Sequence, residues 1–285
     1  MRVALYYPWI HLPGGAERTI LELTGRSRHR FTIFTHHLAR EMTFEGFAAR
    51  EIVELGRIGT RRSVSTVAGA ALRVAAERLP MADFDALIVV SEGVGDLIVF
   101  RTSDRPILCI CLTPLRIAFD EAYRERYLAS RDPVRRAIVR AGAAAFRRLD
   151  ALAWRRYAHI LCISEEARRR AAEGGLARAE ALEIQHVGLG FEPEPDAGAR
   201  SGDYFLLPGR VMWTKNVELG IRAYQRMKAL RPELARLRLV VAGVVDAKSE
   251  EYFASLRALA GDDPGIEFHR FPSDAALRAL YRGCL

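Results

Sequence analysis

Short runs of aliphatic and β-branched residues alternate along most of the chain with segments whose apolar positions recur at helical spacing. Such alternation predicts βαβ units, and therefore a parallel sheet with helices on both faces. The run Ala86–Val90 is apolar throughout, as is typical of a strand that is covered on both faces. The predicted strands are 2–8, 31–35, 51–54, 85–91, 106–112, 159–163 and 183–187, and the predicted helices are 15–25, 63–79, 133–156 and 164–174.

The periodicity stops near residue 190, where Gly188–Gly198 is rich in glycine, proline and acidic residues and is typical of a linker. A second alternation follows, with predicted strands 203–208, 237–243 and 266–269 and predicted helices 216–230, 249–260 and 274–283. We therefore expect an α/β protein of two Rossmann-like, doubly wound domains, residues 1–190 and 203–285, joined by linker 191–202. Three strands are few for such a domain, so the second is expected to be incomplete.

Composition restricts the class of protein. The chain has 285 residues, half of them apolar, which is ordinary for a soluble globular protein. Its first residues are typical of a strand rather than a signal peptide, and no apolar run is long enough to span a bilayer. We expect a cytoplasmic protein, or one bound to the inner membrane on its cytoplasmic face. Four cysteines, interpreted as structural, are Cys109, Cys111, Cys162 and Cys284.

The net charge is +8, and its densest part is an arginine-rich segment between Tyr123 and Tyr157. Apolar residues lie between these arginines at helical spacing. Two interpretations stay open, a solvated helix face and a surface attracted to anionic lipid headgroups. Nucleic acid is not an expected partner, because no nucleic-acid-binding motif accompanies the charge.

Two glycines, Gly14 and Gly15, follow the first predicted strand and open a predicted helix. At such a turn, backbone N–H groups and the helix dipole can face an anion. The pattern is not G-x-G-x-x-G, so a nicotinamide cofactor is not expected.

Arg210 and Lys215 follow the first predicted strand of the second domain. Ligands of open α/β sheets usually bind at this end of a strand. Arginine offers a planar fork to phosphate oxygens, and lysine offers a mobile point charge. Fixed cations there would stabilise a diphosphate leaving group as it gains charge, and Gly243 would allow a further close approach.

Acidic residues and histidines supply further candidates. Asp83-Phe-Asp85 could hold a divalent metal, or could simply be acids at the start of a buried strand. His11, His36 and His37 follow strand ends, where each could contact a hydroxyl acceptor, act as a base, or be solvated.

Taken together, these segments resemble the glycosyltransferase family 4 enzymes, which have the GT-B fold. The resemblance covers essentially the whole chain in order. It is carried by Gly14–Arg18, Leu112–Asp120, Phe146–Asp150, Cys162–Glu165, Gly209-Arg210 with Trp213–Asn216, Ala242-Gly243 with Glu251–Phe253, and Pro272–Asp274 through Leu280-Tyr281.

The resemblance implies a retaining, metal-independent hexosyltransferase that needs no cofactor and moves a sugar from a nucleotide sugar to a hydroxyl acceptor in glycan or glycolipid synthesis. By the same resemblance, Gly14, Gly15, Arg210 and Lys215 contact the donor diphosphate. The first domain would bind the acceptor, often a lipid-linked glycan. The segment from Thr113 to Arg116 is most similar to members that use GDP-mannose. Thr113 and Arg116 are also candidates for contact with the acceptor or the cleft.

The sequence departs from the family in two ways. Relatives commonly carry a histidine before Thr-Pro, where this chain has Leu112, and leucine cannot form hydrogen bonds or transfer a proton. A later pair of glutamates is also missing. Two hypotheses therefore remain, a truncated transferase and a non-catalytic module that binds an acceptor, a membrane or a partner chain. The last helix is expected to leave Leu277, Leu280 and Tyr281 partly uncovered.

Overall fold

The computed structural model describes residues 1–59, 64–102, 105–129, 131–188 and 202–285. The chain divides into two compact units, unit 1 (Met1–Glu192) and unit 2 (Pro193–Leu285). The sequence-based boundaries, at residues 190 and 203, lie on either side of this division. Apart from Gly202, the predicted linker lies outside the described residues.

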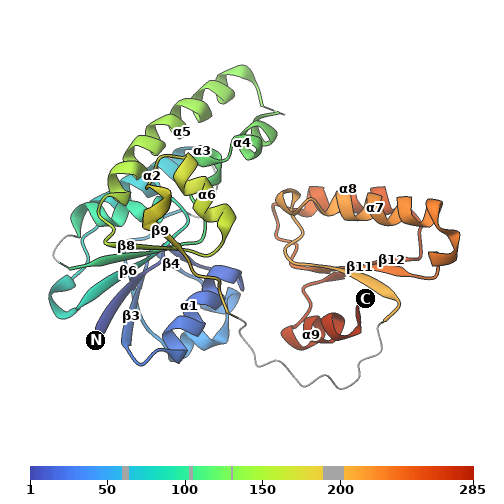
Figure 1. The fold of residues 1–285 in the computed structure, drawn as a ribbon, viewed down its shortest axis with the longest axis horizontal. Helices are drawn as coiled ribbons and strands as arrows, with labels where there is room; N and C mark the ends of the chain where they lie inside the picture. Colours follow the sequence, from blue (N-terminus) through green and yellow to red (C-terminus); the bar gives the residue numbers. More distant parts are fainter. Residues whose placement is uncertain (60–63, 103–104, 130, 189–201) are drawn as a thin grey trace. The chain divides into compact units, whose positions relative to one another are not determined.

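Unit 1 is built on a parallel sheet in the order β5-β3-β1-β6-β7-β8-β9, to which seven strands of the described chain contribute (Figure 1). The predicted α/β class with a doubly wound sheet is confirmed. The strands are β1 (Arg2–Tyr6), β3 (Arg30–Thr35), β5 (Glu51–Glu54), β6 (Ala86–Ser91), β7 (Ile107–Cys111), β8 (His159–Cys162) and β9 (Leu182–Ile184), and a separate short pair is β2 (Trp9–Ile10) with β4 (His37–Leu38).

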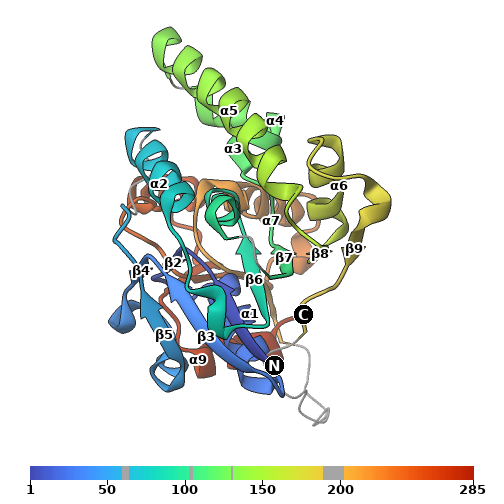
Figure 2. The same ribbon diagram turned by 90° about the vertical axis from the view of Figure 1, so that its left-hand side faces the viewer.

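Helices cover both faces of this sheet (Figures 1 and 2). On β1, Ala4 and Tyr6 point into the cluster formed with the helices of one face, whereas Leu5 points into the other cluster with Ile20 and Phe47. The first face carries α2 (Val64–Ala76), the 3-10 helix η4 (Val94–Arg101), α5 (Pro133–Trp154) and α6 (Glu165–Glu173); the second carries α1 (Gly15–Arg26) and the 3-10 helix η2 (Glu45–Ala49).

Some elements were not predicted. The 3-10 helix η4 is buried from Val94 to Val99, so it lacks the polar face that would mark a helix in the sequence. The helices α3 (Arg116–Phe119) and α4 (Glu121–Leu128) are short and meet at Asp120, whose side chain caps α4 by accepting from Tyr123 N. The remaining short elements of unit 1 are the 3-10 helices η1 (Arg40–Met42), η3 (Met81–Asp83) and η5 (Ala179–Ala181).

Unit 2 contains a parallel sheet in the order β10-β11-β12. Its core packs Leu239 and Val241 of the central strand against Ile221, Phe253 and Leu256 of the helices α7 and α8. The elements are β10 (Tyr204–Pro208), η6 (Trp213–Lys215), α7 (Val217–Leu230), η7 (Pro232–Leu234), β11 (Arg238–Gly243), α8 (Glu250–Ala260), β12 (Ile266–Arg270) and α9 (Asp274–Gly283).

The last helix, α9, lies on the opposite face of this sheet from α7 and α8 (Figure 1). It is held by Tyr204, whose hydroxyl donates to Leu280 O at 2.7 Å. Leu277 and Leu280 are half-buried and Tyr281 is 55% exposed, so the expectation of a partly uncovered helix is confirmed. Among the helices of the described segments, none has the length and apolar character needed to cross a bilayer.

Two aspartates lie in the core of unit 1, where a charged carboxylate is costly. Asp96 on η4 and Asp150 on α5 are both fully buried. Asp96 accepts from Ser91 Oγ at 2.7 Å and from the hydroxyl of Tyr157. Burial raises the pKa of Asp96 to about 6 despite these hydrogen bonds, and burial together with the charge of Asp96 raises the pKa of Asp150 well above its usual value.

Asp150→Asn is expected to stabilise the protein at neutral and alkaline pH. Because both carboxyl groups have raised pKa values in the fold, the folded state holds more protons than the unfolded state above about pH 4. The free energy of unfolding of the wild-type protein should therefore fall as the pH rises through 6. The variant should gain about 1–3 kcal/mol at pH 8 and less at pH 5, measured by urea unfolding. Asp262→Asn, at an exposed position, is the control; a destabilised D150N at pH 8 would contradict this interpretation.

Candidate functional site

The sequence-predicted site residues of unit 1 follow the carboxyl ends of β1, β3 and β7, which meet at one edge of the parallel sheet. The glycine pair follows β1 and opens α1, with Gly14 as its N-cap and no side chain capping the helix. A Cβ on Gly14 would lie 2.6 Å from Glu17 Oε2, and Glu17 is itself buried. A Cβ on Gly15 would meet nothing within 4 Å, so this position faces open space.

Two of the three candidate histidines lie together. The short strands β2 and β4 pair Trp9 with His37, and this pairing brings the ring of His11 to 5.9 Å from the ring of His37 in an edge-to-face arrangement. Both side chains are half-buried. The sequence offered no signal for this contact, because strands of two residues carry no detectable periodicity.

His36 differs from the expectation of a residue at the surface of a cleft. Its side chain is fully buried, with the ring 5.8 Å from that of Tyr6. The ring Nδ1 lies 2.6 Å from the carbonyl oxygen of Gly56. Burial lowers the pKa of His36, so the neutral imidazole with its proton on Nδ1 fits this hydrogen bond. The geometry gives His36 a part in fixing the loop after β3, because solvent does not reach the ring.

Thr113 and Arg116 belong to a polar network that the sequence did not reveal. Arg170 on α6 donates to Thr113 Oγ1 at 2.7 Å and to Asp120 Oδ2 at 3.1 Å. Arg116 donates to the same carboxylate oxygen at 2.9 Å and lies over the ring of Tyr123. The network fixes the loop after β7 against α6. Its members Arg170 and Thr113 are 57 residues apart in the sequence.

Asp120 is the centre of this network. Burial alone would raise its pKa, but the hydrogen bonds from Tyr123 N–H and Arg116 and the charges of Arg116 and Arg170 lower the pKa below its usual value. Asp120 ends the motif Leu112–Asp120, whose resemblance gives it no role. The sequence does not reveal Arg170 as a partner, because an arginine on a solvated helix is ordinary. Leu112, at the unusual position of the motif, packs against the apolar cluster around α1.

In unit 2, the loop after β10 carries the two predicted cations. Gly209 has a φ of 125°, which favours glycine, and Arg210 follows it. Lys215 ends the 3-10 helix that Trp213 begins, and Asn216 then opens α7 in the left-handed conformation, with a φ of 53°. Arg210 and Lys215 are both exposed, and the described part of the chain gives neither an ion-pair nor a hydrogen-bond partner. Two uncompensated positive charges therefore lie at the carboxyl edge of this sheet.

The group that approaches Gly243 closely is protein backbone, and the approach of a ligand there stays a prediction. A Cβ at Gly243 would lie only 1.7 Å from the carbonyl oxygen of Gly209. The loop after β10 and the end of β11 are joined by hydrogen bonds from Gly209 N to Ala242 O and from Val211 N to Val244 O, both 2.9 Å long. Tyr252 accepts from Val217 N at 3.0 Å and so fixes the start of α7. Arg210 thus projects from a loop that is held on both sides.

The D-x-D segment lies at the other edge of unit 1's sheet. Asp85 Oδ2 accepts from Arg2 N at 2.8 Å, and Asp83 lies 3.9 Å from the Arg2 guanidinium. Both carboxylates therefore contact Arg2, the first residue of β1. This agrees with the interpretation that they are acids at the start of a buried strand and not metal ligands. Within the described segments, no group of three or more His, Cys, Asp or Glu side chains could hold a metal ion. Cys109, Cys111 and Cys162 are free and buried, and Cys284 is free and half-buried.

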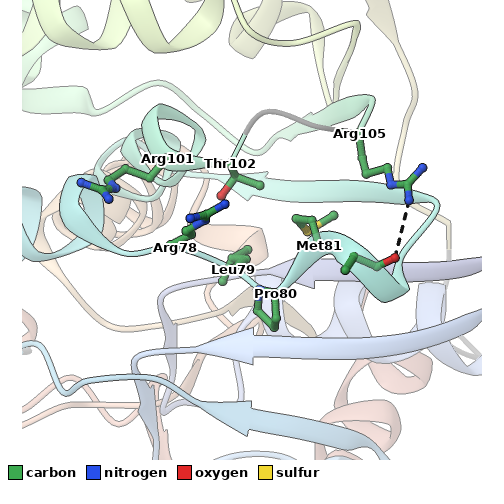
Figure 3. A pocket seen from close by; sticks show the side chains of 8 residues that line it. Arg78, Leu79, Pro80, Met81, Arg101, Thr102 and Arg105 are labelled. Carbon is green, nitrogen blue, oxygen red and sulfur yellow. Dashed lines mark hydrogen bonds between the residues drawn. The ribbon is translucent and has the colours of Figure 1, made fainter.

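A cavity of about 660 Å³ lies at this same edge, where β6 and β7 begin (Figure 3). Arg78, Arg101 and Arg105 line it, but their side chains point in different directions, and Arg105 donates to Ala82 O at 3.5 Å. Because the guanidinium groups do not converge, the cavity lacks the geometry of an anion site. None of the sequence-predicted site residues lines it.

No protein-family model and no curated protein sequence matches the chain. Solved structures do. HepE from Anabaena in complex with UDP and glucose matches with a TM-score of 0.61 and 15% identity, over 100% of this chain and 72% of HepE. UDP-GlcNAc 2-epimerase from Neisseria meningitidis bound to UDP-GlcNAc matches with a TM-score of 0.52 and 12% identity, over 99% of this chain and 75% of the epimerase. The likeness shows the fold, which is of the GT-B type.

Gly243→Ala tests the backbone approach in unit 2. The added methyl group would force Gly209 and Gly243 apart, so unit 2 should lose about 3 kcal/mol or more of stability. Hydrogen exchange measures each unit separately and should show faster exchange in β10 and β11, with unit 1 unchanged. Gly142→Ala on α5, where the methyl group meets nothing within 4 Å, is the matched control. Unchanged exchange in β10 and β11 would show that the two loops separate at little cost.

Proposed function

We propose that the protein is a glycosyltransferase that uses a nucleotide-sugar donor. The observation that carries this proposal is the exposed pair Arg210 and Lys215 on the loop between β10 and α7, for which the described residues supply no ion-pair partner. Cations without protein partners are suited to an anionic ligand, and they lie at the strand edge where open α/β sheets bind nucleotides. The GT-B fold adds support, since HepE was solved with UDP and with UDP-glucose.

The chemistry follows from where negative charge develops. In glycosyl transfer, the bond between the sugar's anomeric carbon and the terminal phosphate oxygen breaks, and the acceptor hydroxyl oxygen bonds to that carbon and loses its proton. The nucleoside diphosphate leaves with the bonding electron pair, so its charge grows in the transition state. Arg210 and Lys215 would therefore stabilise the diphosphate more strongly in the transition state than in the ground state, which is the condition for catalysis.

Unit 1 is proposed to bind the acceptor. The ring pair His11 and His37 and the network of Thr113 and Arg116 follow the carboxyl ends of its strands and include half-buried polar groups suited to hydroxyls. Leu112 supplies no such group, so within this proposal the histidine pair is the candidate for proton transfer. Gly14 and Gly15 are proposed to receive the donor diphosphate at the start of α1.

The finer features of the proposal come from the family resemblance: membership of family 4, retention of the anomeric configuration, no metal requirement, and an acceptor in glycan or glycolipid synthesis at the cytoplasmic membrane face. For the donor, the resemblance indicates GDP-mannose, whereas HepE was solved with UDP-glucose. The diphosphate is common to both, and it is the part that the two cations would bind.

Arg210→Ala and Lys215→Ala should each lower kcat/KM by about a hundredfold, because each removes a charged contact to the leaving group. Arg210→Lys should recover part of the loss, since it restores the charge without the planar fork. Transfer is measured with UDP-glucose, UDP-GlcNAc and GDP-mannose, and calorimetry gives the affinities for UDP and GDP. Anomeric NMR signals of the product report retention or inversion.

Arg222→Ala and Arg226→Ala are the matched controls, because both arginines are exposed on α7 and neither has a described partner. They should leave turnover unchanged. Conversion of UDP-GlcNAc without an acceptor would instead indicate epimerase chemistry. If the wild-type chain binds neither UDP nor GDP, the non-catalytic module is the better account.

Gly15→Ala should separate ligand binding from folding in unit 1. The added methyl group meets no protein atom within 4 Å, and alanine is favoured over glycine in a helix, so the variant should be as stable as the wild type or up to about 1 kcal/mol more stable. If a phosphate approaches this turn, the methyl group should weaken UDP or GDP binding at least about tenfold. Equal nucleotide affinity in this variant and in the wild type would remove Gly15 from the site.

A further inference from the structure

Helix α5 has two apolar faces, and only one of them packs on unit 1. The inner face places Ala143, Phe146, Ala153 and Trp154 in the core. The outer face carries a second set of aliphatic side chains that are exposed to solvent. These are Val134, Ile138, Leu149 and Leu152, which are 68%, 49%, 46% and 48% exposed.

The outer residues form one stripe along the helix. With 3.6 residues per turn, positions 134, 138, 149 and 152 lie within a narrow angular range, and the exposed Ala141 and Ala145 fall between them. Scattered exposed leucines are ordinary, whereas a continuous aliphatic stripe along a helix of 22 residues is not. Both views show the N-terminal part of α5 extending beyond the sheet of unit 1 (Figures 1 and 2). The exposure of Leu149 and Leu152 shows that the stripe is also accessible near the C-terminal end of the helix.

The exposed charged residues of α5 itself are all arginines. From Pro133 to Arg156 the only acidic residue is Asp150, and it points into the core. Arg140 is paired with Glu125 of α4 at 2.9 Å, so part of the arginine charge is compensated. Three arginines on the outer side, Arg148, Arg155 and Arg156, are exposed and have no ion-pair partner among the described residues.

We propose that the outer face of α5 docks on the surface of an anionic phospholipid bilayer. The aliphatic stripe would enter the boundary between headgroups and acyl chains, and the arginines near the C-terminal end of the helix would reach the lipid phosphates. This inference does not depend on the proposed glycosyl transfer, because it uses neither the glycine turn nor the cations of unit 2.

Two other partners fit less well. A second copy of the chain packed on the same face would bring two positively charged helices together, and like charges across such an interface are unfavourable. Nucleic acid would satisfy the arginines but would leave the aliphatic stripe in water, because the phosphate backbone offers it no apolar surface. A bilayer surface matches the charge and the apolar stripe together.

The test is sedimentation of the full chain with vesicles of phosphatidylcholine alone or with about one third phosphatidylglycerol. Binding should require the anionic lipid and weaken as the salt concentration rises from about 0.1 to 0.5 M. The triple variant Arg148→Glu, Arg155→Glu and Arg156→Glu should bind about a hundredfold more weakly or worse, because each basic residue near such a surface gives about a fivefold gain. The apolar variant Ile138→Ser, Leu149→Ser and Leu152→Ser should bind at least about tenfold more weakly.

Each variant has a control matched in chemistry. Arg222→Glu, Arg226→Glu and Arg257→Glu make the same change in net charge at exposed positions of unit 2. Leu72→Ser, Leu219→Ser and Leu230→Ser remove exposed leucines from α2 and α7, where the side chains are 74%, 60% and 59% exposed. Both controls should bind vesicles as the wild type does, and thermal unfolding should show that all four variants are folded.

Three results would overturn the proposal. The first is the absence of sedimentation with the anionic vesicles. The second is an equal loss of binding in the α5 variants and their controls, which would assign the effect to net charge or total apolarity. The third is a dimer in sedimentation velocity that the apolar α5 variant abolishes, which would make a second copy the occupant of this face.

Discussion

Every strand pairing within the described residues is parallel, and this constraint decides where the chemistry of the molecule lies. Parallel strands need a crossover connection, so the loops that leave their carboxyl ends gather at one edge of each sheet. In unit 1 these loops carry the glycine turn, the histidine pair and Thr113. In unit 2 they carry Arg210 and Lys215. The opposite edge of unit 1 holds the D-x-D carboxylates, which compensate the first residue of β1.

Much of this arrangement could be predicted from the sequence. Strands such as Ala86–Ser91 are continuous apolar runs, and helices such as α7 have a clear apolar period, so most element boundaries fall within one or two residues of expectation. The elements that the sequence did not predict are those that are too completely buried or too short to show a periodic pattern of apolar and polar residues. The 3-10 helix η4 is buried almost throughout, and β2 with β4 has two residues on each strand.

The candidate residues were placed by the same logic, with the same limits. Arg210 and Lys215 lie at a strand end because a recognisable strand precedes them. His36 also follows a strand, yet its ring turns inward to Gly56 O, and nothing in a sequence reports which way a loop side chain turns. The contact between Arg170 and Thr113 depends on α6 lying beside the loop after β7, so it belongs to tertiary structure alone. The outer stripe of α5 was visible as spacing, but only the fold shows which of its apolar residues the core takes.

Trp213 gives the molecule an optical property that follows from its position. It lies three residues after Arg210 and begins the short helix that ends at Lys215, and it is the single tryptophan of residues 193–285. The other two, Trp9 and Trp154, lie in unit 1, where Trp154 is buried against Tyr157. With these two replaced by phenylalanine, the remaining indole fluorescence would originate a few residues from both cations. The loop between β10 and α7 thus contains its own spectroscopic label.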